Sequence, residues 1–407
     1  MGIDDHRHKR VLIYSHDSFG LGHLRRCRAI AHSLVDGDKH VSVLILSGSP
    51  IIGSFDFRAR VDFVRIPGVI KLRNGEYTSL SLHLHIEETL RLRASIIRHT
   101  AEAFRPDLFI VDKEPLGLRG EVEDTLELMR LRGVPTVFGL RDVMDEPSQL
   151  APEWTRKNTV QALTRYYDEL WVYGLPQICD PLKGIMLPVS LRERMQYTGY
   201  LRRKSPTHSP IDRIAAFGDL PFLLVTPGGG GDGGELIDWV ISAYEHDPTL
   251  PFGVLLVFGP FMAPDQQAEF QRRVSRLRLA EAITFDARIE TLMERAAGIV
   301  AMGGYNTFCE ILSFDKPALI VPRMRPRREQ FIRASRAAEL GLATMLVDDG
   351  DRAPQRMAEA LHRLPKQPVP SSVAIPGLLD GLDTVNRLAS RWLHPSGTQP
   401  ALTGSHR

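Results

Sequence analysis

The sequence predicts an α/β protein of two successive doubly wound domains, and three observations carry that prediction. The chain has 407 residues, which is more than one hydrophobic core usually serves. Short apolar runs alternate with segments of helical periodicity in both halves, as in parallel sheets covered by helices. Glycine-rich stretches stand at several junctions between such a run and a helical segment, where folds of this class bind ligands.

The first half carries one complete strand-and-helix series. Its apolar runs are short and its helical segments lie between them, so we expect a first domain over residues 1–195. The expected strands are 11–14, 41–46, 108–111, 136–140 and 169–173, and the expected helices lie near 22–35, 121–132 and 155–167.

A polar, proline-punctuated stretch follows, and we place a linker at residues 196–215. A second series predicts a second domain over residues 216–380, with a cleft between the domains. A last helix at 381–395 could cross back to the first domain, and residues 396–407 form a disordered tail. The expected strands of the second domain are 222–226, 253–258, 282–285, 298–301, 318–321 and 343–347, with a helix at 236–244.

Composition excludes several classes of function. The formal net charge is +2, from 51 basic and 49 acidic side chains, so no overall basic field favours nucleic acid. Cys27, Cys179 and Cys309 are far apart, which predicts neither a disulfide framework nor a thiolate metal site. The apolar runs are too short for a signal peptide or a membrane span. We therefore expect a soluble cytoplasmic protein, with peripheral membrane contact left open.

The strongest motif is the stretch Thr226–Glu235, which holds six glycines between an expected strand and a helix. Glycine lets the backbone approach an anion closely, and the free N–H groups of the following helix attract phosphate. We predict a diphosphate loop that includes Gly229, Gly230, Gly231 and Gly233. The alternative is a flexible connection.

A second glycine junction spans Ala301–Glu310. Gly303 and Gly304 end a strand, and Asn306 or Thr307 can cap the next helix. Glu310, expected in the first turn of that helix, could accept hydrogen bonds from ribose hydroxyls. The alternative is that Glu310 only offsets the helix dipole.

A third junction, Gly20-Leu21-Gly22-His23, opens the first helix. Gly22 allows close approach, and His23 could take a proton from a hydroxyl or bind phosphate. Asp112 and Glu114 follow another expected strand, and either carboxylate could act as the base or merely pair with Lys113 or Arg119. The catalytic candidates are therefore His23, Asp112 and Glu114. Asp142 follows a further strand in the same way.

An arginine stretch from Arg323 to Arg336 stands out in this balanced chain. It could neutralise substrate phosphates or meet an anionic membrane surface. A solvated helix face is the alternative for most of these arginines.

These motifs, with Lys316–Pro322 and Arg328-Glu329-Gln330, resemble those of family 28 glycosyltransferases, the family that contains the N-acetylglucosaminyltransferase of lipid II synthesis. The resemblance covers most of the chain and implies a GT-B fold of two Rossmann-like domains. The second would bind a nucleoside diphosphate sugar and the first the acceptor, with no cofactor and no required metal. It also implies that Glu310 binds ribose, Gln330 a sugar hydroxyl and Arg288 the region of the base. The nucleotide would be lined by Gly303, Gly304, Asn306 and Thr307.

Two departures from the family pattern stand out. Gly231 replaces a serine that the family usually has, so one hydrogen bond to the diphosphate is in doubt. The first glycine loop reads Gly-x-Gly-His-x-x-Arg, which is similar to nucleotide-sugar hydrolases of the same fold.

The sequence thus predicts an inverting transferase that uses a UDP-sugar and an acceptor hydroxyl in cell-surface glycan or polysaccharide synthesis. The acceptor could be a lipid-linked saccharide. The alternatives are a nucleotide-sugar hydrolase or 2-epimerase, and an inactive nucleotide-binding partner of a glycan assembly complex.

Overall fold

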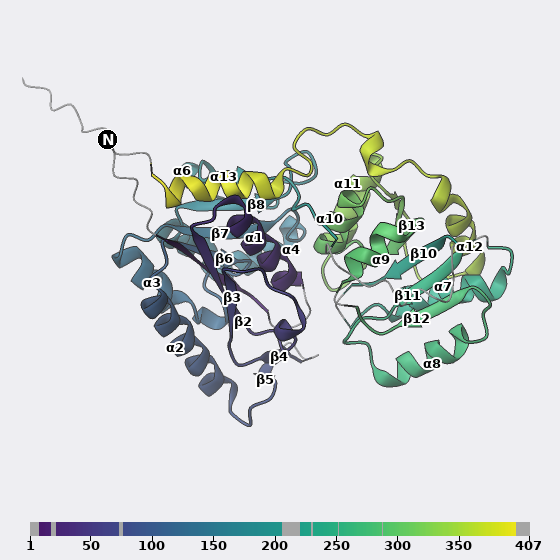
Figure 1. Ribbon diagram of the computed structural model, residues 1–407, viewed down its shortest axis with the longest axis horizontal. Helices are drawn as coiled ribbons and strands as arrows, with labels where there is room; N and C mark the ends of the chain where they lie inside the picture. The colour runs from purple at the N-terminus through teal and green to yellow at the C-terminus, as the bar shows by residue number, and fades with distance from the viewer. Residues whose placement is uncertain are drawn as a thin grey trace, which may run out of the picture.

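The computed structural model of the protein describes residues 8–17, 22–72, 76–205, 220–228, 231–250, 252–286 and 288–395. Two parallel sheets stand beside each other, each with its own helices (Figure 1). The predicted fold class is confirmed, because all strand pairs within these two sheets are parallel.

The first sheet has the strand order β3-β2-β1-β6-β7-β8-β9. The direction of winding reverses between β1 and β6, and this switch point is where doubly wound sheets form a crevice. The strands are β1 (Lys9–Ser15), β2 (Val41–Ser47), β3 (Val61–Arg65), β6 (Leu108–Asp112), β7 (Thr136–Arg141), β8 (Glu169–Tyr173) and β9 (Met195–Tyr197).

Alternate strand residues face opposite sides of this sheet, so helices cover both faces. Helix α1 (Gly22–Gly37) packs on one face, where Ile30 and Leu34 share a core with Val11 and Ile13. The other face carries α2 (Ile86–Phe104), α3 (Glu123–Leu131), α4 (Pro147–Arg156) and α5 (Thr159–Tyr166). Helix α6 (Val189–Arg192) and the antiparallel hairpin of β4 (Val69–Lys71) and β5 (Tyr77–Ser79) complete this part of the chain.

One predicted helix of this domain is interrupted in the structure. The segment predicted as a single helix near 155–167 is divided between α4 and α5. Asn158 separates them with φ 50°, a left-handed conformation that ends a helix and that asparagine tolerates better than most residues.

The second sheet has the order β12-β11-β10-β13-β14-β15, with its switch point between β10 and β13. Its strands are β10 (Phe222–Thr226), β11 (Gly253–Val257), β12 (Ala280–Ile283), β13 (Gly298–Ala301), β14 (Ala318–Ile320) and β15 (Thr344–Met345). Helices α7 (Gly234–His246), α8 (Pro264–Val274) and α12 (Pro354–Arg363) share one core with the sheet. Helices α9 (Ile289–Arg295) and α10 (Tyr305–Ser313) cover its other face, and α11 (Glu329–Glu339) packs beside α10.

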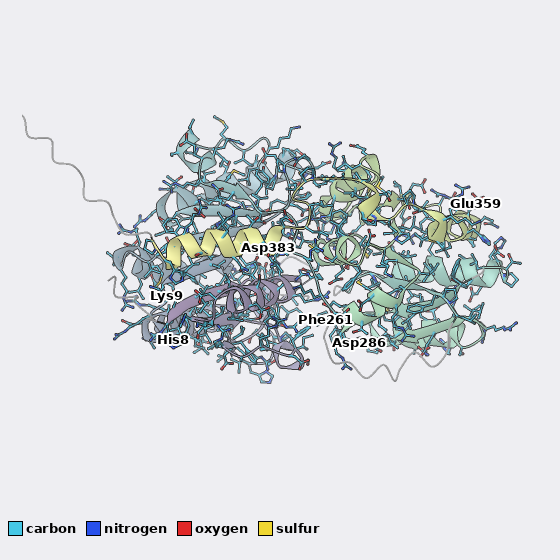
Figure 2. The ribbon with its side chains drawn as sticks, turned by 45° about the horizontal axis from the view of Figure 1, so that its top comes forward. His8, Lys9, Phe261, Asp286, Glu359 and Asp383 are labelled. Carbon is cyan, nitrogen blue, oxygen red and sulfur yellow. The ribbon has the colours of Figure 1, made fainter. Side chains whose placement is uncertain are left out.

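The final helix, α13 (Gly381–Leu393), lies against α1 of the first domain (Figure 1). Val385, Leu388 and Leu393 are buried in the same core as α1. A Cβ atom at Gly381 would lie only 2.5 Å from the carbonyl oxygen of Tyr200, so this crossing requires glycine. Figure 2 shows α13, with Asp383 near its start, extending across the first domain.

Two further predictions concern the linker and the C-terminal tail. Strand β9 includes residues 196 and 197, so the first sheet extends into the predicted linker. Residues 206–215 of that linker and the predicted tail, 396–407, lie outside the described residues. Within the described ranges, no helix has both the length and the apolar character needed to cross a bilayer.

Candidate active site

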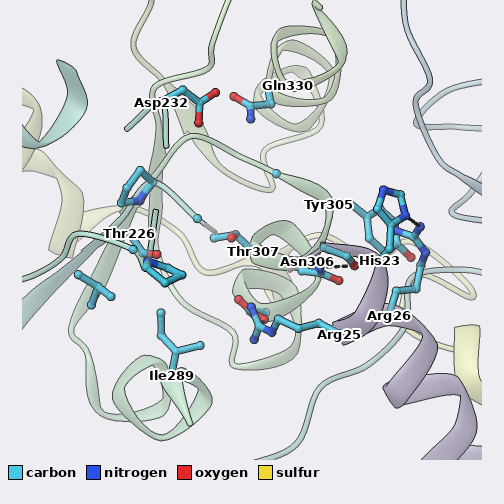
Figure 3. A pocket seen from close by; sticks show the side chains of 18 of the residues that line it. His23, Arg25, Arg26, Thr226, Asp232, Ile289, Tyr305, Asn306, Thr307 and Gln330 are labelled. Atoms are coloured by element: carbon cyan, nitrogen blue, oxygen red, sulfur yellow. Dashed lines mark hydrogen bonds and ion pairs between the residues drawn. The ribbon is translucent and has the colours of Figure 1, made fainter. Parts of the chain in front are cut away.

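A cavity of about 270 Å³ lies between the two domains. Its walls come mainly from segments that follow β1, β10 and β13, the strands at the two switch points. In Figure 3, His23 and Arg26 stand on one side, with Thr226 and Ile289 opposite. The predicted residues that line the cavity are Gly22, His23, Gly304, Asn306, Thr307, Glu310 and Gln330.

An apolar contact joins the domains beside the cavity. Phe261 and Phe285 of the second domain pack against Leu24, Ile52 and Phe55 of the first. Figure 2 shows Phe261 and Asp286 on the side of the second domain that faces the first. Burial of these side chains favours a closed arrangement of the two domains.

His23 is the second residue of α1, and an acid at the end of β6 holds its ring. The Nδ1 atom of His23 lies 2.5 Å from Oδ2 of Asp112. Arg26 donates to both carboxylate oxygens of Asp112, at 2.6 and 2.7 Å. Nη2 of Arg26 also lies 2.9 Å from Nδ1, but the contact with Asp112 is the shorter one, and an ionised carboxylate can only accept. Nδ1 therefore carries the proton and donates it to Asp112. The Nε2 atom is then unprotonated and can accept a proton.

The protonation states follow from burial and charge. Burial lowers the pKa of His23 to about 3, although Asp112 acts in the opposite direction. Burial raises the pKa of Asp112, but the charges of Arg26 and His23 outweigh it and hold this pKa well below its usual range. At neutral pH the pair is therefore a neutral imidazole oriented by a carboxylate, the arrangement of a general base.

The other predicted carboxylates do not join this pair. Glu114 lies outside the cavity lining, and its Oε2 is 3.2 Å from Nζ of Lys157. It therefore pairs with a cation, as the alternative expected, but with Lys157 in place of Lys113 or Arg119. Asp142 is fully buried and receives two hydrogen bonds from Arg333, at 2.7 and 2.5 Å.

The long glycine loop is described only in part. Gly229 and Gly230 lie outside the described residues. Gly228 has φ 103° and lines the cavity, whereas Gly231 and Gly233 are not among its lining residues. Gly233 precedes α7, and a Cβ there would lie 2.1 Å from Cβ of Pro227, so close packing explains this glycine.

The second glycine pair turns the chain from β13 into α10. Gly303 has φ 76°, and a Cβ on it would lie 2.7 Å from Cγ2 of Ile320. Gly304 is the N-cap of α10, and a Cβ there would meet no atom within 4 Å, because it faces the cavity. The free N–H groups of this helix start therefore point to a place where an anion can bind.

Asn306 and Thr307 lie inside the first turn of α10 and do not cap it, contrary to the prediction. Asn306 instead joins the domains: its Nδ2 donates to the carbonyl oxygen of Gly22 at 2.9 Å, and its Oδ1 accepts from Arg203 at 2.7 Å. Asn306 thus lines the cavity while its amide is committed to holding α1 and α10 together.

Glu310 is the sixth residue of α10, so it lies in the second turn and not in the first, as predicted. Its carboxylate is completely buried; Oε1 accepts from Arg25 of the first domain, and Oε2 has no partner among the described residues. Arg25 also donates to Glu290, at 2.7 Å. Burial raises the pKa of Glu310 to about 7, Glu290 raises it as well, and Arg25 opposes both. A buried acceptor with an unused oxygen at a cavity wall is suited to a hydroxyl donor.

The two remaining predicted ligands, Gln330 and Arg288, differ in their position relative to the cavity. Gln330 lines the cavity, and its Oε1 accepts from the backbone N–H of Arg323 at 2.9 Å, which orients the amide group. Arg288 precedes α9, is exposed and is not among the lining residues. Its neighbours Phe285 and Ile289 line the cavity instead and offer apolar surface.

Sequence reasoning gave no role to several cavity residues, notably Arg25 and Phe55, and it named Arg141 only together with Asp142 after the strand 136–140. Arg25 follows His23 by two positions, so the start of this helix was the available signal. Arg141 ends β7, and its position after an apolar strand was the equivalent signal.

The arginine stretch forms several ion pairs within the protein. Arg323 pairs with Asp232 and Glu329. Arg327 pairs with Glu153, and Arg328 with Glu146 at 2.5 Å, both across the domain boundary. Most of these arginines therefore have acidic partners within the protein, and Arg323 and Arg333 also line the cavity.

Comparisons with known proteins agree with this architecture. A curated glycosyltransferase of unknown specificity from Methanosarcina acetivorans is 24% identical over 392 residues, which cover 91% of this chain and 96% of the relative. Phytolacca americana UGT2, solved with UDP-2-fluoroglucose and pterostilbene, superimposes with a TM-score of 0.60 at 14% identity, covering 94% of this chain and 99% of that one. The glycosyltransferase VinC, solved with dTDP, gives a TM-score of 0.55 at 18% identity, covering 93% and 94%.

The fold and the interdomain site define a glycosyltransferase with the GT-B fold. Residues 223–370 match the model of the glycosyltransferase family 28 C-terminal domain. The chain is a glycosyltransferase with the GT-B fold, and its second domain is similar to the family 28 C-terminal domain.

Proposed function

We propose that the protein transfers a sugar from a UDP-sugar to an acceptor hydroxyl with inversion at the anomeric carbon, and that His23 is the general base. The observation that carries the proposal is the meeting of two groups in one cavity. The Nε2 of a neutral, oriented His23 comes from the first domain, and the start of α10 with the unused oxygen of Glu310 comes from the second.

The second domain supplies the donor subsite. Gly228 and the N-terminus of α10 would hold the diphosphate through backbone N–H groups, and Oε2 of Glu310 would accept from a ribose hydroxyl. Phe285 and Ile289 would contact the base, and Gln330 a sugar hydroxyl. The UDP and dTDP complexes of the structural relatives support a nucleoside diphosphate in this position.

The first domain supplies the chemistry. As the acceptor oxygen attacks the anomeric carbon, its proton passes to Nε2 of His23. The bond from that carbon to the diphosphate oxygen breaks on the opposite side, and the electron pair leaves with the nucleoside diphosphate. Backbone N–H groups at the start of α10 stabilise the charge that develops there. Asp112 holds the ring of His23 and stabilises the imidazolium that forms.

The proposed setting is the cytoplasm, where all three cysteines would stay in the free state that they have here. The proposed acceptor is a glycan precursor, and a lipid-linked one would bring the protein to a membrane surface. Leucines exposed near β5 and the start of α2 support such contact; they are Leu72, Leu80, Leu82, Leu84 and Leu92. Cosedimentation with vesicles that contain anionic lipid tests it, and equal recovery without vesicles would contradict it.

A panel of nucleotide sugars tests the reaction itself. We expect a UDP-sugar to raise the melting temperature, and UDP to be released only when an acceptor is added. Release that does not depend on acceptor would identify a hydrolase, and interconversion of sugars without net release a 2-epimerase. Tight nucleotide binding without turnover under any condition would identify an inactive partner. If no nucleotide shifts the melting temperature, the proposal fails.

A further inference from the structure

Two cations at the edge of the first sheet have no ionic partner among the residues that the structure describes. Lys113 directly follows β6, and Arg141 ends the neighbouring strand β7. Both side chains are partly buried, and neither forms a hydrogen bond or ion pair through its side chain with any residue that the structure describes. The Nε atom of Arg141 is buried without a partner. Burying an unpaired cation is costly, which makes this pair unusual in an otherwise balanced cleft.

The two cations lie next to each other. β6 and β7 are parallel neighbours with Asp112 opposite Gly139, and the backbone N–H of Lys113 donates to the carbonyl oxygen of Gly139 at 2.9 Å. Burial, together with the charge of Arg141, lowers the pKa of Lys113 to about 8. The pKa of Arg141 falls to about 10, mainly through burial.

The nearby carboxylates are already engaged with other cations. Asp112 is held by Arg26, and Glu114 pairs with Lys157 at 3.2 Å. On the side of Arg141, Asp142 is held by Arg333, and Glu329 pairs with Arg323 at 2.8 Å. Within the described part of the chain, two positive charges therefore remain without an ion-pair partner at this edge.

The backbone of Lys113 is strained as well. Its φ is 70°, in the left-handed region that costs a residue with a Cβ atom roughly 1 kcal/mol or more. Strain of this kind persists where the surrounding structure holds a side chain in a particular place. Here that place adjoins the base, since the charge of Lys113 acts on the pKa of His23.

We propose that Lys113 and Arg141 form an anion subsite for the acceptor, which therefore carries a phosphate or carboxylate group near the hydroxyl that is glycosylated. The inference rests on the proposed transfer reaction. It assigns these cations to the acceptor because both come from the first domain. Arg141 lines the same cavity as His23, and Lys113 directly follows Asp112, which holds the ring of His23. The proposed diphosphate ligands, Gly228 and the start of α10, come from the second domain.

The test uses the full chain, UDP and inorganic phosphate in isothermal titration calorimetry at constant ionic strength. The wild-type protein is first saturated with UDP, and phosphate is then titrated. We expect phosphate to bind, and Arg141→Gln and Lys113→Met each to weaken it at least tenfold. Lys183→Met, which removes an exposed cation away from the cavity, should change nothing.

The affinity for UDP separates the two proposals. We expect Arg141→Gln and Lys113→Met to bind UDP as the wild type does. A tenfold loss of UDP affinity in these variants would place the cations on the donor diphosphate and overturn the inference. If wild-type protein binds UDP but then takes up no phosphate, the inference fails and the proposed transferase stands. If UDP does not bind, the proposed function fails, and phosphate titrated alone against the same variants still decides whether these residues form an anion site.

Two further ligands distinguish the source of the anion. Glucose 1-phosphate and glucuronate are titrated into the UDP complex, with glucose as the neutral control. Binding of the phosphate ester that depends on Arg141 points to a phosphorylated acceptor, and equivalent binding of glucuronate points to an acid sugar. The inference is wrong if glucose binds as tightly as glucose 1-phosphate and glucuronate, and if Arg141→Gln and Lys113→Met bind these three ligands with the affinity of the wild type.

Discussion

The two sheets share a strand order around their switch points but present different chemistry at their carboxyl edges. The edge of the first sheet carries His23, Asp112, Lys113 and Arg141, all of them ionisable. The edge of the second presents glycines and the start of α10, with two buried acids, Glu310 and Glu329. Backbone N–H groups suit a diphosphate that every donor shares, whereas ionisable side chains suit the step that moves a proton. We therefore expect changes at the first edge to alter turnover and changes at the second edge to alter donor binding.

The largest effect should come from His23→Ala. Without a base to accept the acceptor proton, kcat should fall by roughly 10²- to 10⁴-fold, while the affinity for UDP stays within a few-fold of the wild type. Steady-state kinetics and calorimetry measure the two quantities. His99→Ala, an exposed histidine of α2, serves as the control. A variant that loses UDP affinity and keeps its kcat would reverse the roles of the two edges.

Glu310→Gln should have the opposite effect, because it should change donor binding and not turnover. Loss of a charged acceptor for a ribose hydroxyl costs about 1.5–3 kcal/mol, so UDP affinity should fall roughly 10- to 100-fold, with kcat at saturation little changed. Calorimetric titration with UDP measures this change. Unaltered affinity would mean that Glu310 serves only to hold Arg25 at the domain boundary.

The pH dependence of UDP affinity and that of kcat distinguish the roles of Glu310 and His23. The pKa of Glu310 is about 7, and its charged form is the better acceptor, so UDP should bind more weakly as the pH falls through 7. The charged groups that act on this carboxyl are Arg25, Glu290 and Arg203. Arg25 outweighs burial and holds the pKa of Glu290 below its usual range, so Glu290 stays ionised over that interval. The pKa of His23 is about 3, so the base stays neutral and kcat should show no acid limb near 6.5. UDP affinity measured from pH 5.5 to 8.5 should therefore fall more steeply with falling pH in the wild type than in Glu310→Gln, where only the terminal phosphate of UDP titrates. Identical profiles in the two proteins would argue against Glu310 as a ligand.

The smallest expected effect is on stability, and it comes from breaking an ion pair between the two domains. Arg328 and Glu146 form a partly exposed ion pair across the domain boundary, and such pairs contribute about 0.2–1 kcal/mol. A double-mutant cycle of Arg328→Gln and Glu146→Gln, followed by urea unfolding, should give a coupling energy in that range. A coupling of several kcal/mol would mean that this exposed pair, and not the buried pair of Arg333 and Asp142, dominates the contact.

The fold was largely predictable because its signals are local. A run such as Val11–Tyr14 is buried on both faces of a parallel sheet, so its sequence alone indicates its environment. The same holds for the glycines before α10, where φ 76° at Gly303 leaves little choice of residue. Asn158 carried no comparable signal, because the break between α4 and α5 depends on a left-handed conformation that asparagine permits but does not require.

The site was less predictable because its pairings are distant in sequence. Glu114 pairs with Lys157, and Arg25 with Glu310 in the other domain, so neither partner could be found from neighbouring residues. The free cations Lys113 and Arg141 are recognisable only after every carboxylate around them has been assigned to another partner. Burial sets the pKa values, and these also depend on the assembled fold, as the low pKa of His23 shows.

The central claim is that an acceptor hydroxyl, activated by His23, attacks the anomeric carbon directly. The anomeric configuration of the product, read from proton coupling constants in a reaction followed by NMR, tests it most directly. Starting from an α-linked UDP-sugar, the account predicts a β-linked product from the wild type and its loss in His23→Ala. An α-linked product, or a β-linked product formed equally fast by His23→Ala, would contradict it.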